Sequence, residues 1–182
     1  AEESITLVKN DNNNLPINTS DQQSIGYIKF GDDSHQTFID YLNKYEQVDH
    51  ISIDSILLRA NLYDKIIVGL HKSDKSPFND YKFTSDEISL INKIKNQTDV
   101  TLVIFSKPYS MLDIDITGIE SILIAYQNSE IFQIKAAQAV FGGIEVKGVL
   151  PVTINEKIPV NTSIKLKKKK ILSFEHHLNK GF

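Results

Sequence analysis

The chain has 182 residues, of which 41% are hydrophobic and 24% are charged, and its formal net charge is −3. This composition is ordinary for a globular domain and excludes an intrinsically disordered chain. The length suits one domain, and the negative charge argues against nucleic-acid binding through a basic face. Because Cys is absent, disulfides and thiolate chemistry are excluded. No apolar run is long enough to span a membrane.

Short apolar runs alternate with amphipathic ones, which predicts an α/β fold with a mostly parallel sheet. After a polar loop over residues 10–24, strands are expected at 24–30, 48–53, 65–70, 100–105, 119–126 and 149–154. Helices are expected at 38–45, at 56–62 behind an Asp54 cap, from 84 to about 97, and from 128 or 129 to 141. These elements predict a three-layer α/β/α sandwich with five to six strands, of the flavodoxin-like type.

Two helix ends carry clear local signals. Thr84 and Glu87 have the spacing of a capping box, in which each side chain binds a free backbone N–H of the other residue. Asn128 or Ser129 is expected to cap the later helix, and Gly142 to end it in a left-handed conformation.

Polar residues cluster after the predicted strands. In a parallel sheet, ligands bind at the carboxyl ends of the strands. The candidates for a substrate cleft or an interface are therefore Asp32, Asp33, His35, His71, Lys107 and Tyr109. The alternative is that these loops are polar because they are solvated and cap helices. His35 beside Asp32 or Asp33 has the composition of an acid–base pair, and equally that of an ordinary helix N-terminus.

Asp32-Asp33 and Lys107-Pro108 also resemble parts of a two-component receiver domain, where carboxylates hold Mg²⁺ and a lysine contacts the phosphoryl group. A receiver needs an aspartate at the end of its third strand, where this chain has His71, and its Lys-Pro follows the fifth strand rather than the fourth. A receiver-like switch is thus a weaker alternative. Glycine-rich phosphate loops and the Gly-x-Ser-x-Gly elbow are absent, and we expect no cofactor and no metal site.

Three stretches of the sequence form one recognisable pattern. They are Glu3–Asn10 with Leu15-Pro16, then Pro108-Tyr109 with Ile122–Tyr126, then Gln138–Gly142 with Gly148–Val152. Together they resemble the C-terminal domain of glycoside hydrolase family 3, which starts with the pattern E-S-I-V-L-L-K-N followed by L-P and later has a helix ending in A-L-F-G before G-x-L-P-V. They extend over residues 3–153, and the first and third are specific as a pair.

The resemblance implies a parent enzyme whose nucleophilic aspartate lies on an N-terminal barrel absent from this chain. In the β-glucosidase branch a glutamate of the C-terminal domain is the acid/base. Glu120, Glu130 and Glu145 are acidic candidates here, but none lies in a matching motif, so the role is carried onto none of them. The missing glutamate motif resembles the β-N-acetylglucosaminidase branch, in which this domain is accessory.

The resemblance therefore implies a non-catalytic family 3 domain over residues 1–165, followed by a basic linker or tail over 166–182. Its expected partner is the barrel of the same protein, with no nucleic-acid partner, and a carbohydrate partner is kept open. A sugar- or small-molecule-binding module is the second alternative. The sequence assigns no compartment, although a periplasmic or secreted location in a bacterium stays open.

Overall fold

The computed structural model describes residues 1–76, 78 and 80–169. At its centre lies a six-stranded sheet with the order β1-β6-β5-β4-β2-β3. The strands are β1 (Thr6–Asn10), β2 (Ile25–Phe30), β3 (Val48–His50), β4 (Lys65–His71), β5 (Asp99–Phe105) and β6 (Ser121–Ile124). All neighbours run parallel except β1, which is antiparallel to β6. The parallel strands follow the flavodoxin-like order 2-1-3-4-5 when they are numbered among themselves.

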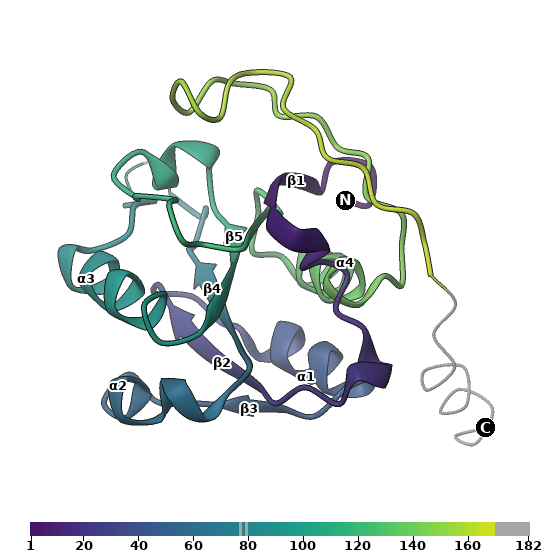
Figure 1. The fold of residues 1–182 in the computed structure, drawn as a ribbon. Helices are drawn as coiled ribbons and strands as arrows, with labels where there is room; N and C mark the ends of the chain where they lie inside the picture. The colour runs from purple at the N-terminus through teal and green to yellow at the C-terminus, as the bar shows by residue number, and fades with distance from the viewer. Residues whose placement is uncertain (77, 79, 170–182) are drawn as a thin grey trace.

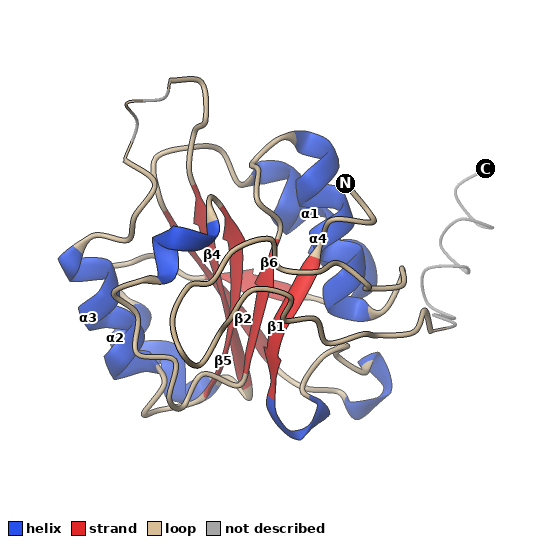
Figure 2. Cartoon of the chain, turned by 90° about the horizontal axis from the view of Figure 1, so that it is seen from above, coloured by secondary structure: helices blue, strands red, loops and turns tan. Residues whose placement is uncertain are grey.

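Helices cover both faces of the sheet (Figure 1). Figure 2 shows α1 (Gln36–Tyr45) and α4 (Glu130–Phe141) on one face, and α2 (Ile56–Arg59) and α3 (Ser85–Ile94) on the other. Short 3₁₀ helices complete the chain: η1 (Asp11–Asn13), η2 (Thr19–Asp21), η3 (Ala60–Leu62) and η4 (Pro108–Met111). The predicted three-layer α/β/α class is confirmed. None of the helices in the described residues is long and apolar enough to cross a membrane.

Apolar runs in the strands supply both halves of the core, because successive side chains point to opposite faces. In β4, Ile66 and Val68 join the cluster beneath α2 and α3, whereas Ile67 joins the cluster beneath α1 and α4. All three side chains are fully buried. Small alanines of α4, among them Ala136, let that helix lie close to the sheet.

The predicted helix ends are mostly confirmed. The Thr84 hydroxyl accepts from the Glu87 N–H at 3.1 Å, and the Glu87 carboxylate accepts from the Thr84 N–H at 2.8 Å. Gly142 has φ +78° and ends α4. Ser129 is the N-cap of α4, without a side-chain cap bond. The predicted Asp54 cap is wrong, because the N-cap of α2 is Ser55.

The predicted strand at 149–154 is wrong, and β1 takes its place in the sheet. Backbone groups of this segment pair locally instead: the Leu150 N–H donates to the carbonyl of Thr162, and the Ile154 N–H donates to that of Ile158. Because β1 already occupies the free edge of β6, the segment has no ladder to join. Its apolar side chains Leu150 and Ile154 are nevertheless buried in the core.

Residues 166–169, which the sequence analysis assigns to the tail, are hydrogen-bonded to the folded part of the chain. Val146 and Leu166 exchange two backbone hydrogen bonds at 2.9 Å, and the Lys169 N–H donates to the Gly142 carbonyl at 2.8 Å. Leu166 also packs against the core cluster beneath α1 and α4. The rest of the predicted tail, 170–182, lies outside the described residues.

Candidate functional site

The carboxyl ends of β2 and β4 lie side by side at the point where the strand order reverses, which is where open α/β sheets bind ligands. The loop after β2 carries Asp32, Asp33 and His35, and His71 ends β4. The structure brings these loops together, since the Asp33 N–H donates to the His71 carbonyl at 3.2 Å. Ser73 likewise donates its N–H to the Asp32 carboxylate at 3.3 Å.

His71 is fully buried, and protein groups bind both of its ring nitrogens. Nδ1 lies 2.6 Å from the Asn128 side-chain oxygen, and Nε2 lies 2.9 Å from the Tyr27 hydroxyl. Burial lowers the pKa of His71 to about 3, so the ring is neutral at neutral pH. The amide oxygen of Asn128 is an acceptor, which puts the proton on Nδ1 and leaves Nε2 to accept from Tyr27. His71 thus has no ring nitrogen free for a ligand.

Gln133 extends this network from α4 to the start of α1. Its side-chain oxygen accepts from the Phe38 N–H at 2.9 Å, and its amide nitrogen donates to the Ser34 carbonyl at 3.0 Å. The same nitrogen donates to the backbone and side-chain oxygens of Asn128. Gln133 and Tyr27 are not among the site residues predicted from the sequence. The available signal was a polar residue between Phe132 and Ala136 on a helix face that is otherwise apolar.

The structure shows no hydrogen bond between His35 and either of its predicted acid–base partners, Asp32 and Asp33, within the described residues. Partial burial by itself raises the pKa of Asp33, but hydrogen bonds from Asn128 and from the Ser34 N–H outweigh it, so that the pKa is lowered. His35 lies against the Tyr27 ring, with centroids 5.5 Å apart, and 4.8 Å from the His50 ring. Burial and the neighbouring His50 lower its pKa. Within the described residues, His35 Nδ1 is buried without a hydrogen-bond partner, and no bond joins it to either aspartate.

Lys107 follows β5 and lines a small hollow of about 70 Å³, whereas Tyr109 lies on η4 and is not among the residues that line it. The Lys107 ammonium lies 5.3 Å from the centroid of the Tyr81 ring. Tyr109, on η4, is 40% exposed, and Leu112, which follows η4, is 45% exposed. Met111 between them is fully buried and belongs to the core.

The receiver-like alternative finds little support in this geometry. Lys107 follows β5, the fourth of the parallel strands, and the third parallel strand, β4, ends in the buried and fully bonded His71. No group of three or more His, Asp or Glu side chains that could hold a metal ion occurs in the described part of the chain.

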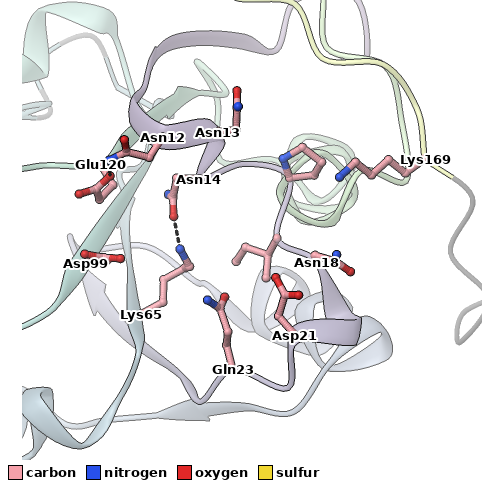
Figure 3. A pocket seen from close by; sticks show the side chains of 12 residues that line it. Asn12, Asn13, Asn14, Asn18, Asp21, Gln23, Lys65, Asp99, Glu120 and Lys169 are labelled. Carbon is pink, nitrogen blue, oxygen red and sulfur yellow. Dashed lines mark hydrogen bonds between the residues drawn. The ribbon is translucent and has the colours of Figure 1, made fainter.

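A second and larger hollow lies at the opposite, amino edge of the sheet, where the sequence analysis predicts only a loop. This cavity has a volume of about 510 Å³ (Figure 3). Its lining residues are Asn12, Asn13, Asn14, Pro16, Ile17, Asn18, Asp21, Gln23, Lys65, Asp99, Glu120 and Lys169. We call it the amino-edge cavity. Its lining residues come from five separate segments of the sequence, so no local motif indicates the cavity.

Lys65 and Asn14 form the centre of the amino-edge cavity. The Lys65 ammonium donates to the Asn14 side-chain oxygen, and the Asn14 amide nitrogen donates to the hydroxyls of Thr101 and Ser121. Lys65 is only 4% exposed, and burial lowers its pKa, although the nearby carboxylates of Asp99 and Glu120 act in the other direction. Among the described residues, no carboxylate forms an ion pair with it.

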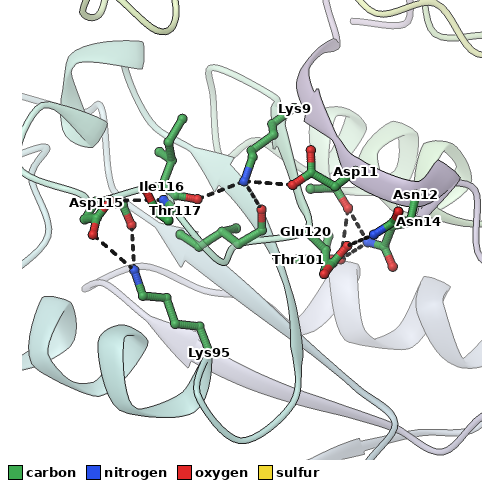
Figure 4. A network of polar contacts seen from close by, with 12 residues as sticks. Lys9, Asp11, Asn12, Asn14, Lys95, Thr101, Asp115, Ile116, Thr117 and Glu120 are labelled. Carbon is green, nitrogen blue, oxygen red and sulfur yellow. Dashed lines mark hydrogen bonds and ion pairs between the residues drawn. The ribbon is translucent and has the colours of Figure 1, made fainter.

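A network of lysine contacts holds one wall of this cavity (Figure 4). The Lys9 ammonium, at the end of β1, donates to the carbonyls of Ile116 and Ile119 and pairs with Asp11 at 3.0 Å. The Asp11 N–H donates to the Glu120 carbonyl at 2.7 Å. These bonds fix the chain after β1 against the loop before β6.

The strand order and the two helix layers define the class of the molecule as a flavodoxin-like α/β domain. Among solved structures, this fold is similar to part of several glycoside hydrolase chains. A β-glucosidase from Listeria innocua, solved with glucose, is 12% identical with a TM-score of 0.71 over 85% of this chain and 26% of that chain. A family 3 exo-β-xylosidase is 15% identical with a TM-score of 0.62, over 82% of this chain and 24% of that one.

A fungal multi-domain family 3 β-N-acetylglucosaminidase is also similar, with 16% identity and a TM-score of 0.58 over 78% of this chain and 17% of that chain. The chain therefore spans between 17% and 26% of the length of these enzymes. At such identities the likeness shows the fold alone. No family model matches the sequence, and no curated protein matches it.

Proposed function

We propose that the chain is an accessory, non-catalytic C-terminal domain of a family 3 glycoside hydrolase. It would pack on an N-terminal barrel that hydrolyses β-N-acetylglucosaminides. The observation that carries the proposal is the fold, which is shared over about four-fifths of this chain with one part of several longer glycoside hydrolases.

Contacts between the family-like stretches support the proposal. The Gly148 N–H donates to the Ile5 carbonyl at 3.1 Å, which joins the first and third stretches. A side chain at Gly148 would come within 2.5 Å of the Ser4 carbonyl oxygen. The Ile17 N–H, beside Pro16, donates to the Val140 carbonyl at 2.8 Å. The residues that carry the resemblance are therefore scaffold positions that depend on one another.

The placement of the acidic candidates supports an accessory role. A retaining glycosidase needs two catalytic groups about 5–5.5 Å apart. Glu120 precedes β6 at the amino edge, where Asn12 donates to its carboxylate, whereas Glu130 begins α4 beyond the carboxyl end of β6. These two carboxylates therefore lie at opposite edges of the sheet and do not form such a pair with each other.

One observation from the sequence favours the β-N-acetylglucosaminidase branch: the chain lacks the glutamate motif that the resemblance implies for the β-glucosidase branch in this domain. The similar solved structures include enzymes of both kinds, so they do not distinguish the two branches.

The carboxyl-edge loops are the surface that we propose to face the barrel. They carry exposed apolar side chains: Phe78 is 93% exposed, Leu112 is 45% exposed and Tyr109 is 40% exposed. Large exposed apolar groups that gather in one region indicate contact with another protein surface. The candidates Asp32, Asp33 and Lys107 lie on loops at the same edge and would border the substrate cleft.

Hydrolysis of p-nitrophenyl N-acetyl-β-glucosaminide tests the proposal. The pure 182-residue chain should be folded and should show no turnover above a boiled control, whereas the same chain joined to its barrel should be active. Turnover by the pure chain, retained through further purification, would show that the domain is catalytic.

A further inference from the structure

The amino-edge cavity lies away from the proposed barrel-facing surface and has the dimensions of a ligand site. Its volume of about 510 Å³ lies within the 300–1,000 Å³ that is typical of small-molecule pockets. The walls come from the segment 12–23, from the first residues of β4 and β5, and from Glu120 before β6. These segments are held by the hydrogen bonds of Asn14 and Lys9. The cavity is therefore built by fixed elements of the fold.

The lining is rich in both hydrogen-bond donors and acceptors. Five amide side chains, three carboxylates and two lysines line it, and the apolar contribution comes from Pro16 and Ile17 alone. An apolar ligand would leave these polar groups unpaired, at a cost for each group. A ligand with many hydroxyl groups, each able to donate and to accept, fits such a lining.

Lys65 provides the fixed donor. Its side chain reaches the cavity from the first residue of β4 (Figure 3), and its single hydrogen bond in the described residues goes to Asn14. An ammonium group has three N–H donors, so two remain for a ligand or for solvent. Buried charged groups are normally hydrogen-bonded, and a ligand oxygen at this position would complete the coordination of the ammonium.

The charges of the lining favour a neutral ligand. Asp21, Asp99 and Glu120 together outnumber the two lysines, so an anion would meet a net negative lining. A cation would in turn meet the buried ammonium of Lys65. A neutral molecule avoids both conflicts and still uses both signs of charge, because its hydroxyl oxygens accept from lysine while its hydroxyl hydrogens donate to carboxylates.

We propose that the amino-edge cavity binds a neutral polyhydroxylated molecule of sugar size. Lys65 donates to its hydroxyl oxygens, and Asp99 and Glu120 accept from its hydroxyl groups. Gln23 and Asn13 also line the cavity and provide further amide contacts. This inference is independent of the proposed accessory role, because it concerns the other edge of the sheet.

Titration of the isotopically labelled 182-residue chain tests the proposal. Glucose and N-acetylglucosamine are added separately, and amide chemical shifts are recorded. The expected result is a saturable shift, with at least one of these sugars, confined to residues 12–23 and the amino ends of β4 and β5. An absence of saturable shifts with both sugars would overturn the proposal, as would shifts confined to the carboxyl-edge loops.

Variants separate a specific site from a general effect of sugar. Lys65→Met keeps an unbranched chain of similar length and removes the ammonium, so that affinity should fall at least about tenfold, as expected for the loss of a charged hydrogen bond. Gln23→Ala changes a half-buried side chain on the cavity wall and should also weaken binding. This variant provides the test if Lys65→Met does not fold. Lys44→Met, on α1 and outside the lining, is the matched control and should bind like the unchanged chain. Equal binding by all folded variants would contradict the proposal.

A titration with an anion tests the inference that the ligand is neutral. Sodium phosphate, at the same ionic strength as a sodium chloride control, should shift the cavity residues no more than the chloride does. If phosphate saturates the cavity and the sugars do not, the cavity is an anion site and the proposal is wrong. Either outcome leaves the accessory-domain proposal unaffected, since that proposal is tested by the activity of the longer protein.

Discussion

His71 ends β4 at the expected binding edge, but its surroundings give it a structural role. The ring stacks on Phe105 with centroids 4.4 Å apart, and its two nitrogens bind Asn128 and Tyr27. A neutral imidazole satisfies both bonds, whereas a protonated one would place a positive charge in a buried site. The sequence places His71 correctly at the edge of the sheet, but it gives no information on burial by α1 and α4.

The stability of the molecule should therefore fall in acid through His71. Its folded pKa of about 3 lies below the ordinary value of 6.5, so the unfolded chain binds the proton first. The contribution is fully present above pH 6.5 and is lost as the pH falls from 6.5 toward 3. Between pH 7 and pH 5 this residue should cost about 2 kcal/mol of unfolding free energy.

Urea unfolding at the two pH values measures this effect. The variant His71→Gln removes the titrating group, so its stability should change less between pH 7 and pH 5 than that of the unchanged chain, by about 2 kcal/mol. The carboxylates are common to both proteins and cancel in the comparison. Parallel pH profiles for the two proteins would show that His71 titrates normally.

Close packing, rather than a left-handed backbone conformation, requires glycine at position 148. A methyl group there would lie 2.5 Å from the Ser4 carbonyl oxygen and closer still to that of Ile5. The substitution Gly148→Ala should therefore lower the unfolding free energy by about 1–3 kcal/mol, as for an overpacked site. The neighbouring Val149 is 51% exposed, and Val149→Ala should change it by less than about 0.5 kcal/mol. Equal effects in urea unfolding would mean that the Gly148 backbone does not touch the first stretch.

At the scale of elements, the parallel strands and their helices were predictable because each carries its own signal. Lys65–His71 is a continuous buried run, and the capping box of α3 lies within four residues. The edge strand β1 and the segment 149–154 were not separable in this way. β1 has only two apolar residues, Leu7 and Val8, whereas the segment 149–154 is mostly apolar, so the local pattern favours the wrong segment. Which of the two pairs with β6 is decided by tertiary contacts.

The contrast between these two segments can be measured. Leu7 in β1 is fully buried, so Leu7→Ala should lower the unfolding free energy by about 2–5 kcal/mol. Val152, in the segment predicted as a strand, is half-buried and belongs to no ladder. Val152→Ala should cost clearly less. A larger loss at Val152 than at Leu7 would indicate that the 149–154 segment, rather than β1, completes the sheet.

At the scale of the whole molecule, the carboxyl-edge candidates were predictable from the strand topology, whereas the amino-edge cavity was not. The rule for parallel sheets places Asp32, His71 and Lys107 at the carboxyl edge, and the structure places them there. The amino-edge cavity was not predictable, because Asn14 and Lys65 are 51 residues apart and meet only in the folded chain. Such a site becomes visible only when tertiary contacts are known.

The barrel-facing surface gives a prediction for the longer protein. Tyr109→Ser together with Leu112→Ser should leave the melting temperature of this chain nearly unchanged, because both side chains are substantially exposed. In the protein that includes the barrel, the same pair should lower the temperature at which activity is lost, since an apolar contact between domains is removed. Leu58→Ser with Leu62→Ser, exposed on α2 and η3, is the matched control. An equal loss for both pairs would place the interface elsewhere.

The central claim is that this chain is the accessory domain of a family 3 glycoside hydrolase, and the coding sequence upstream of Ala1 tests it most directly. Sequencing that region in the source genome should reveal, in the same reading frame, a barrel domain with the stretch Lys-His-Phe-Pro-Gly-His, which the resemblance to the β-N-acetylglucosaminidase branch implies for the barrel. A barrel with this stretch is the result that the proposal predicts. A stop codon close upstream of Ala1, or an in-frame domain of another fold, would contradict it.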